Sequence, residues 1–380
     1  MKIHTLSWTP VSGLSAPETG GEDSDLVIYF GGRETLKGAA WREAFSARFP
    51  SALHFGCSAG GQIAANDIAD DTINAVAVKF ERTTLRSAEI EIADAAETRR
   101  CGQTLAAALD APDLAGVLVL SDGLKVNGSE LVAGLVDVIG KRAPICGGLA
   151  ADDAEFLETL VGLSGPPRAG LIAAIGFYGK DLRIGHGSGG GWEVFGPNRI
   201  ITKSQGNVLL ELDGQPALDL YESYLCPEDI EGLPGTAMLF PLLIRSPDCH
   251  EMDLVRTVLA IDRETRSMTF AGDMPTGWTA QLMRSTLESL ARGAATAADR
   301  SSTIPENGDG LALIISCVGR KLVMGQRVAD EIDAIVERLP AGAARLGFYS
   351  YGELSPHART GFCELQNQTM TIMTLTEAPL

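Results

Sequence analysis

The sequence predicts an α/β protein with α+β character, made of two domains whose mixed β-sheets are flanked by helices. Short apolar runs, typical of buried strands, alternate with stretches that can form helices, which indicates layered α/β packing. Strands also lie back to back around glycine-rich turns, which indicates sheets that are mixed rather than purely parallel. A unit of strand, helix, strand, turn and strand recurs along the chain, so we expect the domains to contain duplicated units.

The clearest repeated feature is a glycine-rich turn between two apolar strands, found at residues 55–63, 144–150 and 346–353. An apolar run and a helix-compatible stretch precede each copy, and a polar loop and a return strand follow it. A chain that reverses between two buried strands must often take a positive φ or pass close to a neighbour, and glycine does so most easily. We expect the three turns to be copies of one hairpin that lie face to face.

The elements of the first half follow from local composition. Residues 1–24 form an N-terminal extension, rich in Pro, Gly, Ser and acid from residue 9 onward. Pro50 ends the first helix, and Asp94 and Glu97 resemble a capping box that begins the second. The predicted strands are 26–30, 52–55, 73–80, 88–92 and 117–120, and the predicted helices are 37–49, 94–109 and 129–139.

From residue 171 onward the pattern changes to strands joined by turns. Asp213 and Gly214 end this block, and Pro216 follows where the first turn of a helix tolerates it. We therefore place the domain boundary near Asp213, with domains at 25–212 and 213–380. The predicted strands are 171–177, 182–186, 199–203, 208–212, 237–244, 255–261, 267–271 and 311–316, and the predicted helices are 217–224, 278–298 and 328–339.

Charge and composition argue against several classes of protein. The net charge of 31 − 49 = −18 argues against binding to nucleic-acid phosphates or to an anionic membrane surface. No window has the roughly 18 uninterrupted apolar residues of a membrane span, and the first residues lack the apolar core of a signal peptide. The seven cysteines, an odd number scattered mostly through apolar runs, are typical of reduced thiols. We therefore expect a cytoplasmic protein that binds neither nucleic acid nor membrane.

Two glycine-rich motifs have functional interpretations that their surroundings disfavour. Residues 56–60 fit the Gly-x-Ser-x-Gly pattern of a hydrolase, with Ser58 or Cys57 as nucleophile, but the residues after them do not look helical. The run 187–191 could cradle a phosphate, yet it lacks the helix that such loops precede. We interpret it as a flexible turn beside which Trp192 can wall a ligand pocket.

The histidines lack the spacing of a zinc site. A haem, however, needs only one axial ligand, so haem stays an alternative cofactor. The candidate ligands are His186, His250, His357 and Cys226.

Acidic residues stand beside two of the glycine turns, namely Asp152, Asp153 and Glu353. A facing pair of carboxylates could transfer protons or grip an ammonium group. Acids at such positions also cap local turns. Both interpretations stay open.

These segments together resemble the FIST family of paired domains. The segments 121–123, 147–153, 186–192 and 212–221 resemble the FIST N-terminal domain, and 240–242, 272–277, 316–320, 347–353 and 367–369 resemble the FIST C-terminal domain. The resemblance covers about residues 25–377. It departs at Gln366, because the family usually has His-Asn-Gln-Thr where this chain has Gln-Asn-Gln-Thr.

The resemblance implies a function in sensing. FIST domains are regarded as intracellular sensory domains that bind small ligands, with amino acids proposed among them, and some members are haem-binding nitric-oxide sensors that regulate a histidine kinase. We therefore expect a stand-alone, non-catalytic sensor that binds an amino-acid-like ligand between its two domains and signals to a separate protein such as a histidine kinase. A haem-based nitric-oxide sensor is the alternative, and a serine or cysteine hydrolase the third. The expected ligand-binding residues are Asp152, Asp153, Trp192, Tyr349, Tyr351, Glu353 and Asn367.

Overall fold

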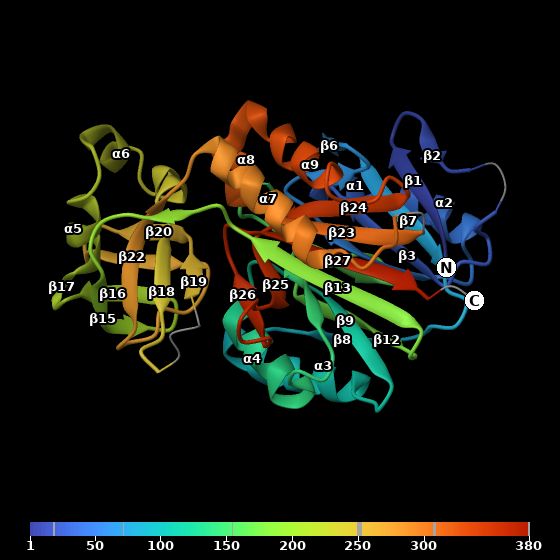
Figure 1. Cartoon of the computed structure of the whole chain (residues 1–380), viewed down its shortest axis with the longest axis horizontal. Coiled ribbons are helices and arrows are strands. Elements are labelled where there is room, and N and C mark those ends of the chain that lie inside the picture. The colour runs from blue at the N-terminus through green and yellow to red at the C-terminus, as the bar shows by residue number, and fades with distance from the viewer. Residues whose placement is uncertain (18–19, 71, 154, 249–252, 307–308, 379–380) are drawn as a thin grey trace.

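The computed structural model describes residues 1–17, 20–70, 72–153, 155–248, 253–306 and 309–378. Three six-stranded sheets with flanking helices form a body, and a nine-stranded sheet forms a smaller lobe at one end of the molecule (Figure 1). We define the lobe as residues 190–286 and the body as the rest of the described chain. None of the helices in these ranges has the length and apolar character that crossing a bilayer requires. The fold is α/β with mixed sheets, as the sequence predicts.

Three units of the body share one strand topology, which confirms the recurring unit predicted from the sequence. In each unit a central strand pairs in parallel with the strand that follows the helices, and antiparallel with the strand that closes the unit. The central strands are β3 (Leu26–Gly31), β9 (Leu114–Ser121) and β23 (Gly310–Cys317), their parallel partners are β4 (Leu53–Ser58), β10 (Ile145–Leu149) and β24 (Ala343–Ser350), and the closing strands are β7 (Ile73–Lys79), β12 (Leu171–Tyr178) and β27 (Met370–Glu377).

After each glycine turn the chain crosses to a neighbouring unit. Strand β5 (Gln62–Ala64) of the first unit pairs with β24 of the third. Strand β25 (Gly352–Pro356) of the third unit pairs with β10 of the second, and β11 (Val161–Leu163) of the second pairs with β4 of the first. These exchanges close the three units into a ring, with the glycine turns at the crossing points. The short strands β6 (Asp67–Ala69) and β26 (Cys363–Gln366) extend β5 and β25.

Further strands and helices complete the sheets. β1 (Lys2–Thr9) and β2 (Gly13–Ser15), both inside the predicted N-terminal extension, widen the first sheet beyond β7. β8 (Thr84–Glu91) pairs with β12, and β13 (Leu182–Gly189) pairs with β27. The helices are α1 (Arg33–Lys37), α2 (Ala40–Arg48), η1 (Ala95–Glu97), α3 (Thr98–Leu109), α4 (Gly128–Ile139), α7 (Leu287–Ser301), α8 (Val318–Met324), η3 (Gly325–Arg327) and α9 (Ala329–Val336).

The units are held together by an apolar core between the sheets, while separate apolar layers lie between the sheets and the helices. In the central core Phe30 of the first unit stacks on Phe348 of the third, with ring centroids 4.4 Å apart. Leu118 of the second unit belongs to the same buried cluster. Burying a side chain of this size contributes about 1.5–3 kcal/mol, so the closed ring is stabilised largely by this shared core.

Helix α7 packs backbone to backbone on strand β13. A Cβ atom at alternate glycines of the strand would collide with carbonyl oxygens one helical turn apart: Gly185 with Ser301 (2.0 Å), Gly187 with Ala297 (2.2 Å) and Gly189 with Gly293 (2.2 Å). The interpretation of residues 187–191 as a flexible turn is therefore wrong for the part within β13. Glycine is required there because the helix lies directly on the strand.

The lobe is one antiparallel sheet with two short helices and a 3-10 turn, and the strand order is β19-β18-β22-β15-β16-β21-β20, with β14 on β22 and β17 on β16. Asp213, where the sequence places the domain boundary, lies between β16 and β17; the boundary itself stays a prediction. The elements are β14 (Glu193–Val194), β15 (Arg199–Gln205), β16 (Val208–Leu212), β17 (Gln215–Pro216), α5 (Ala217–Glu222), α6 (Pro227–Glu231), η2 (Gly235–Leu239), β18 (Leu242–Arg245), β19 (Asp253–Arg256), β20 (Val258–Asp262), β21 (Ser267–Phe270) and β22 (Thr279–Arg284).

Three predicted elements of the second half are wrong in type or extent. The predicted strand 255–261 is two strands, β19 and β20, which lie at opposite ends of the lobe's sheet. The predicted helix 278–298 is strand β22 followed by α7, because Thr286 caps the helix: its side chain accepts a bond from the N–H of Ser289 at 3.1 Å. Of the predicted strand 237–244, only the part from Leu242 onward is extended. Pro241 precedes it and cannot donate a hydrogen bond to a sheet.

Candidate ligand-binding site

The three glycine turns meet at the centre of the body. Each turn donates a backbone N–H to a carbonyl of another turn: Gly60 to Tyr349 (2.9 Å), Tyr351 to Leu149 (3.1 Å) and Ala151 to Ser58 (3.1 Å). This cyclic pattern follows from the strand exchange, because each turn begins where one unit's strand ends and the next unit's sheet begins. Side chains from distant parts of the sequence are thereby brought together around the ring.

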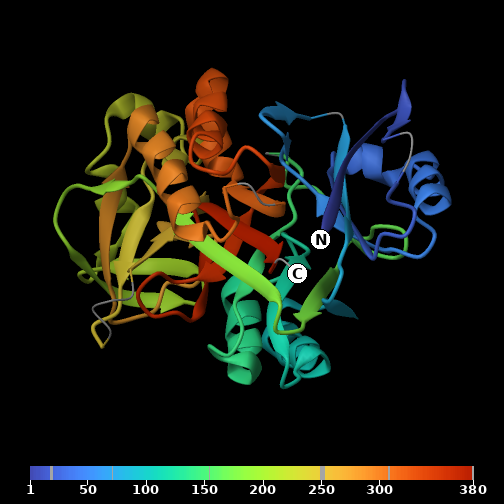
Figure 2. The same cartoon turned by 45° about the vertical axis from the view of Figure 1, so that its right-hand side comes forward.

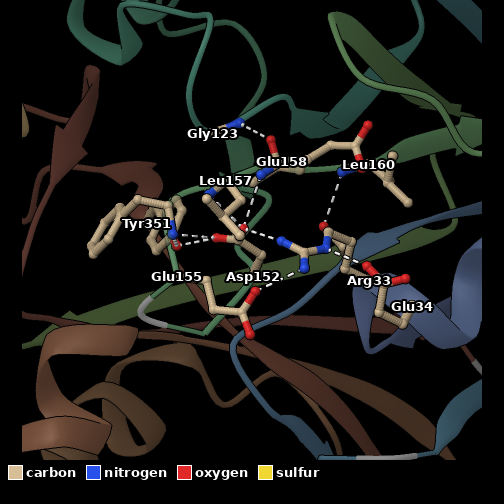
Figure 3. Close-up of polar contacts among 12 residues, drawn as sticks. Arg33, Glu34, Gly123, Asp152, Glu155, Leu157, Glu158, Leu160 and Tyr351 are labelled. Carbon is tan, nitrogen blue, oxygen red and sulfur yellow. Dashed lines mark hydrogen bonds and ion pairs between the residues drawn. The ribbon is translucent and has the colours of Figure 1, made fainter.

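Asp152, directly after the second turn, is the most highly coordinated side chain of this region (Figure 3). Its Oδ2 accepts hydrogen bonds from Arg33 Nη1 at 2.8 Å and from the N–H groups of Leu157 and Glu158. Its Oδ1 accepts a bond from the hydroxyl of Tyr351. Burial acts to raise the pKa of Asp152, but these hydrogen bonds and the charge of Arg33 hold it below its ordinary value. The carboxylate is therefore ionised and saturated by protein donors.

A cavity of about 280 Å³ lies where the body meets the lobe, and we call it the interdomain cavity. From the body, the loop 123–128, Leu149, Phe156 and Tyr351 line it. The ring of Phe156 stacks on that of Tyr351 with centroids 4.8 Å apart and an interplanar angle of 10°. The lobe contributes Asn207, Leu259 and residues 270–272. Both parts of the molecule thus line one cavity.

The lining combines apolar side chains with a few polar ones. Lys125 is the charged side chain among the described lining residues, and it is exposed and forms no ion pair with them. Asn127 caps helix α4 through bonds from the N–H groups of Ser129 (3.0 Å) and Glu130 (3.2 Å). The helix terminus is therefore already satisfied by the chain. A ligand with an anionic group and an apolar body matches this surface.

The same edge of the cavity holds the lobe against the body. Asn127 of the body donates to Asp273 Oδ1 of the lobe at 3.1 Å. Arg256 of the lobe is buried and donates to the carbonyls of Asp273 and, in the body, of Leu365, both at 3.1 Å. Burial lowers the pKa of Arg256 to about 10. Gly272 is necessary beside it, because a Cβ there would lie 2.8 Å from Arg256 Nε.

A second cavity, of about 200 Å³, lies on the other side of Asp152, and we call it the turn cavity. Asp152, Asp153 and Glu155 line it opposite Arg33 and the first glycine turn. Asp153 has φ +63° and pairs with Lys321 at 3.5 Å. The acids at this position thus have partners within the protein.

The other four residues expected to bind ligand lie away from the interdomain cavity. The indole of Trp192 donates to the carbonyl of Gln368 at 3.0 Å, and the hydroxyl of Tyr349 donates to Glu331 at 2.7 Å. Asn367 is fully buried, and its side-chain amide has no hydrogen-bond partner among the described residues. The ring brings Asp152 and Tyr351 together. Trp192 contacts the chain segment 366–369, to which Asn367 belongs, whereas the hydroxyl of Tyr349 bonds to Glu331.

Glu353 is the fourth of these residues and is fully buried in strand β25. Its carboxyl accepts bonds from Ser350 Oγ at 2.7 Å and from Thr369 Oγ1 at 2.8 Å. Burial nevertheless raises its pKa to about 8. Glu353 is therefore mostly protonated near neutral pH. A neutral carboxyl does not form the ion pair with a ligand's ammonium group that the sequence suggested as one interpretation.

The candidate haem ligands are scattered. His186 lies on β13 and is half-buried, whereas Cys226 is exposed and donates to Asp229 at 3.1 Å. His357 lines a small cavity of about 170 Å³ whose lining includes Asp253 and Arg300. His250 lies outside the described residues. A haem needs an apolar slot beside its axial ligand, and the described surroundings of His357 do not fit one.

The hydrolase motif is not arranged as a nucleophile elbow. Strand β5, rather than a helix, follows Ser58. Ser58 is fully buried, and its hydroxyl accepts a bond from the N–H of Leu160 at 2.9 Å. Burial raises the pKa of the Cys57 thiol well above its ordinary value. Neither side chain has the activation that a nucleophile needs.

Several residues of the interdomain cavity were missed by the sequence reasoning. Asn127, followed by Gly128, Ser129 and Glu130, carries a helix-start signal that could have drawn attention to this loop. Phe156 and Leu259 carry no such signal, because an isolated apolar residue in a loop or strand does not reveal which neighbour it meets.

Comparison with known proteins gives the following matches. The family model of the FIST N domain matches residues 25–215, and that of the FIST C domain matches residues 217–356. No curated protein matches the chain. Among solved structures, a cyanuric acid hydrolase from A. caulinodans aligns with a TM-score of 0.37 and 8% identity, over 100% of this chain and 99% of that one.

Proposed function

Because this chain belongs to the FIST family, whose domains are sensory domains suggested to bind small ligands, we propose that it senses an amino-acid-like molecule bound in the interdomain cavity. The observation that carries the proposal is the composition of that cavity's wall. Body and lobe both contribute to it, so a ligand that touches both favours one orientation of the lobe. Binding is thereby coupled to the relative position of the two parts.

The chemistry of the lining supports a ligand of this class. A flexible lysine at the rim, Lys125, is suited to an α-carboxylate. The amides of Asn127 and Asn207 are neutral polar partners, and the stacked rings of Phe156 and Tyr351 suit an apolar side chain. Cavities of about this volume, apolar with a few polar groups, commonly hold small ligands.

The output is proposed to pass through a separate protein, such as a histidine kinase. A change in lobe orientation would alter the surface that such a partner contacts, and it requires no chemistry on the ligand. Six cysteines in the described residues are unpaired, and five of them are buried. This supports a reducing compartment, and we propose the cytoplasm.

The proposal is tested by isothermal titration of the purified protein with a panel of amino acids. We expect saturable binding for a subset of the panel, weakened about tenfold by Lys125→Ala. Lys180→Ala, which removes an exposed lysine from the turn between β12 and β13, is the matched control and should bind as the parent does. Ala271→Leu fills the cavity and should abolish binding. The absence of a heat of binding for every amino acid in the panel would contradict the proposal. Equal affinity in the parent and the three variants would contradict it as well.

A further inference from the structure

A further cavity lies in the first unit, between helix α2 and strands β3 and β4; this unit is the blue part of the molecule in Figures 1 and 2. Its volume is about 290 Å³, and it shares no described lining residue with the interdomain cavity. Tyr29 comes from β3, His54 from β4, Trp41 and Arg42 from α2, and residues 164–166 from the loop after β11. We call it the α2 cavity.

Tyr29 is only 1% exposed, yet its hydroxyl has no hydrogen-bond partner among the described residues. Its ring packs against Trp41 with centroids 4.8 Å apart. Gly162 leaves room for the hydroxyl, because a Cβ at that position would lie 2.3 Å from the oxygen. Buried tyrosine hydroxyls usually have a partner, and this one lines the cavity, where it is available to a ligand or to water.

Arg42 is the second unpartnered group. No described residue forms an ion pair or a side-chain hydrogen bond with it, and its Nε is buried without a partner. The chain has 49 acidic residues and 31 basic ones. With acids in such excess, an arginine is expected to have an acidic partner, and Arg42 has none among the described residues. The exposed Glu43 beside it also lines the rim without pairing with it. A guanidinium left in this state is ready to bind a carboxylate through two parallel hydrogen bonds.

His54 adds a neutral acceptor. Its Nε2 lies 3.1 Å from the carbonyl oxygen of Phe49, which can only accept, so Nε2 carries the hydrogen. Burial lowers the pKa of His54, so the ring is neutral near pH 7 and Nδ1 is an acceptor. The lining therefore carries two charged side chains, Arg42 and the exposed Glu43, and the neutral polar groups of Tyr29 and His54 beside the ring of Trp41.

We propose that the α2 cavity is a second binding site, which takes a small carboxylate with a flat apolar body. The carboxylate would accept hydrogen bonds from Arg42 and from the hydroxyl of Tyr29, while the body packs against Trp41. This site is independent of the function proposed for the interdomain cavity, since the two share no described residue.

Titration with benzoate tests the proposal, with benzamide as the neutral compound of the same shape. We expect saturable benzoate binding that is weakened about tenfold or more by Arg42→Gln, since the variant loses a hydrogen bond between two charged groups. Tyr29→Phe keeps the ring packing and should weaken binding several-fold. Benzamide should bind less tightly than benzoate.

Two control variants separate this site from others. Arg292→Gln removes an exposed arginine on α7 and should bind benzoate as the parent does. Lys125→Ala alters the interdomain cavity and should leave the part of the benzoate binding that depends on Arg42 in place. Absence of saturable binding, or equal affinity in the parent, Arg42→Gln and Tyr29→Phe proteins, would overturn the proposal. Loss of benzoate binding in Lys125→Ala but not in Arg42→Gln would assign the binding to the interdomain cavity instead.

Discussion

The hydroxyl of Tyr351 donates a hydrogen bond to the carboxylate of Asp152, and the pair stands between two cavities. Tyr351 faces the interdomain cavity and Asp152 faces the turn cavity. The two residues belong to different units, and the strand exchange at the glycine turns brings them together. The wall of the proposed ligand site therefore depends on the closure of the ring.

Tyr351→Phe should destabilise the protein by about 1.5–3 kcal/mol, because it removes a hydrogen bond to a buried charge. The ring would still stack on Phe156, so the fold should persist. Urea unfolding followed by circular dichroism measures the change. Tyr29→Phe, which removes a buried tyrosine's hydroxyl that has no partner among the described residues, is the comparison variant, and an unchanged midpoint for Tyr351→Phe would contradict the assigned bond.

Glu353 should make the protein less stable as pH rises. Its pKa is about 8 in the folded protein and 4.5 in the unfolded chain, so the folded state holds the proton more tightly. The stability from this group is complete below pH 4.5 and is lost as pH rises toward 8, by up to about 1.4 kcal/mol per pH unit. The free energy of unfolding of Glu353→Gln should vary less over this range. Identical slopes in Glu353→Gln and the parent would exclude a buried neutral carboxyl.

Glu377 should have the opposite dependence. Burial acts to raise its pKa, but bonds from the N–H groups of Glu81 and Arg82 and from the hydroxyl of Thr83 lower it to about 2. The stability from this carboxylate is complete above pH 4.5 and is lost as pH falls toward 2. Glu377→Gln should be less stable at pH 7 and lose less on acidification. Parallel acid unfolding curves for the two proteins would refute the assignment.

The sequence predicted the recurring unit well, because the apolar runs around β3, β9 and β23 and the glycines of the turns are local signals. It did not reveal the ring, since the exchange of β5, β11 and β25 between units is set by pairing between distant segments. The prediction of one helix from residue 278 was wrong because the alternation of apolar and polar residues in β22 is short. It is followed almost directly by the apolar stripe of α7.

The candidate site was predictable only in part. Asp152 and Tyr351 stand beside glycine turns, and such positions signal a functional loop. Trp192 and Asn367 also stand beside turns, but neither lines the interdomain cavity. Trp192 bonds to the carbonyl of Gln368, and the side-chain amide of Asn367 is buried without a partner among the described residues. The lobe's contribution to the interdomain cavity depends on how the lobe docks, which Arg256 and Gly272 determine through contacts that no local pattern encodes.

Arg320 should hold in place the two chain segments that join the lobe to the body, one at residue 190 and one at residue 286. It is fully buried, pairs with Glu331 at 2.9 Å, and donates to the carbonyls of Gly190 and Leu290, one beside each connection. Arg320→Met leaves the carboxylate of Glu331 unpaired, which should cost about 3–5 kcal/mol. Hydrogen exchange in residues 190–192 and 285–290 should accelerate more than in β9. Arg292→Met, on the exposed Arg292 of α7, is the control, and uniform exchange in both variants would contradict the role.

The most direct test of the central claim is amide hydrogen exchange with and without the amino acid that binds most tightly. The account predicts slower exchange on both walls of the interdomain cavity, in residues 123–128 of the body and 258–272 of the lobe, and no such protection in Lys125→Ala. Protection that is absent from these two segments, or confined to one of them, would contradict the proposal that the ligand bridges body and lobe.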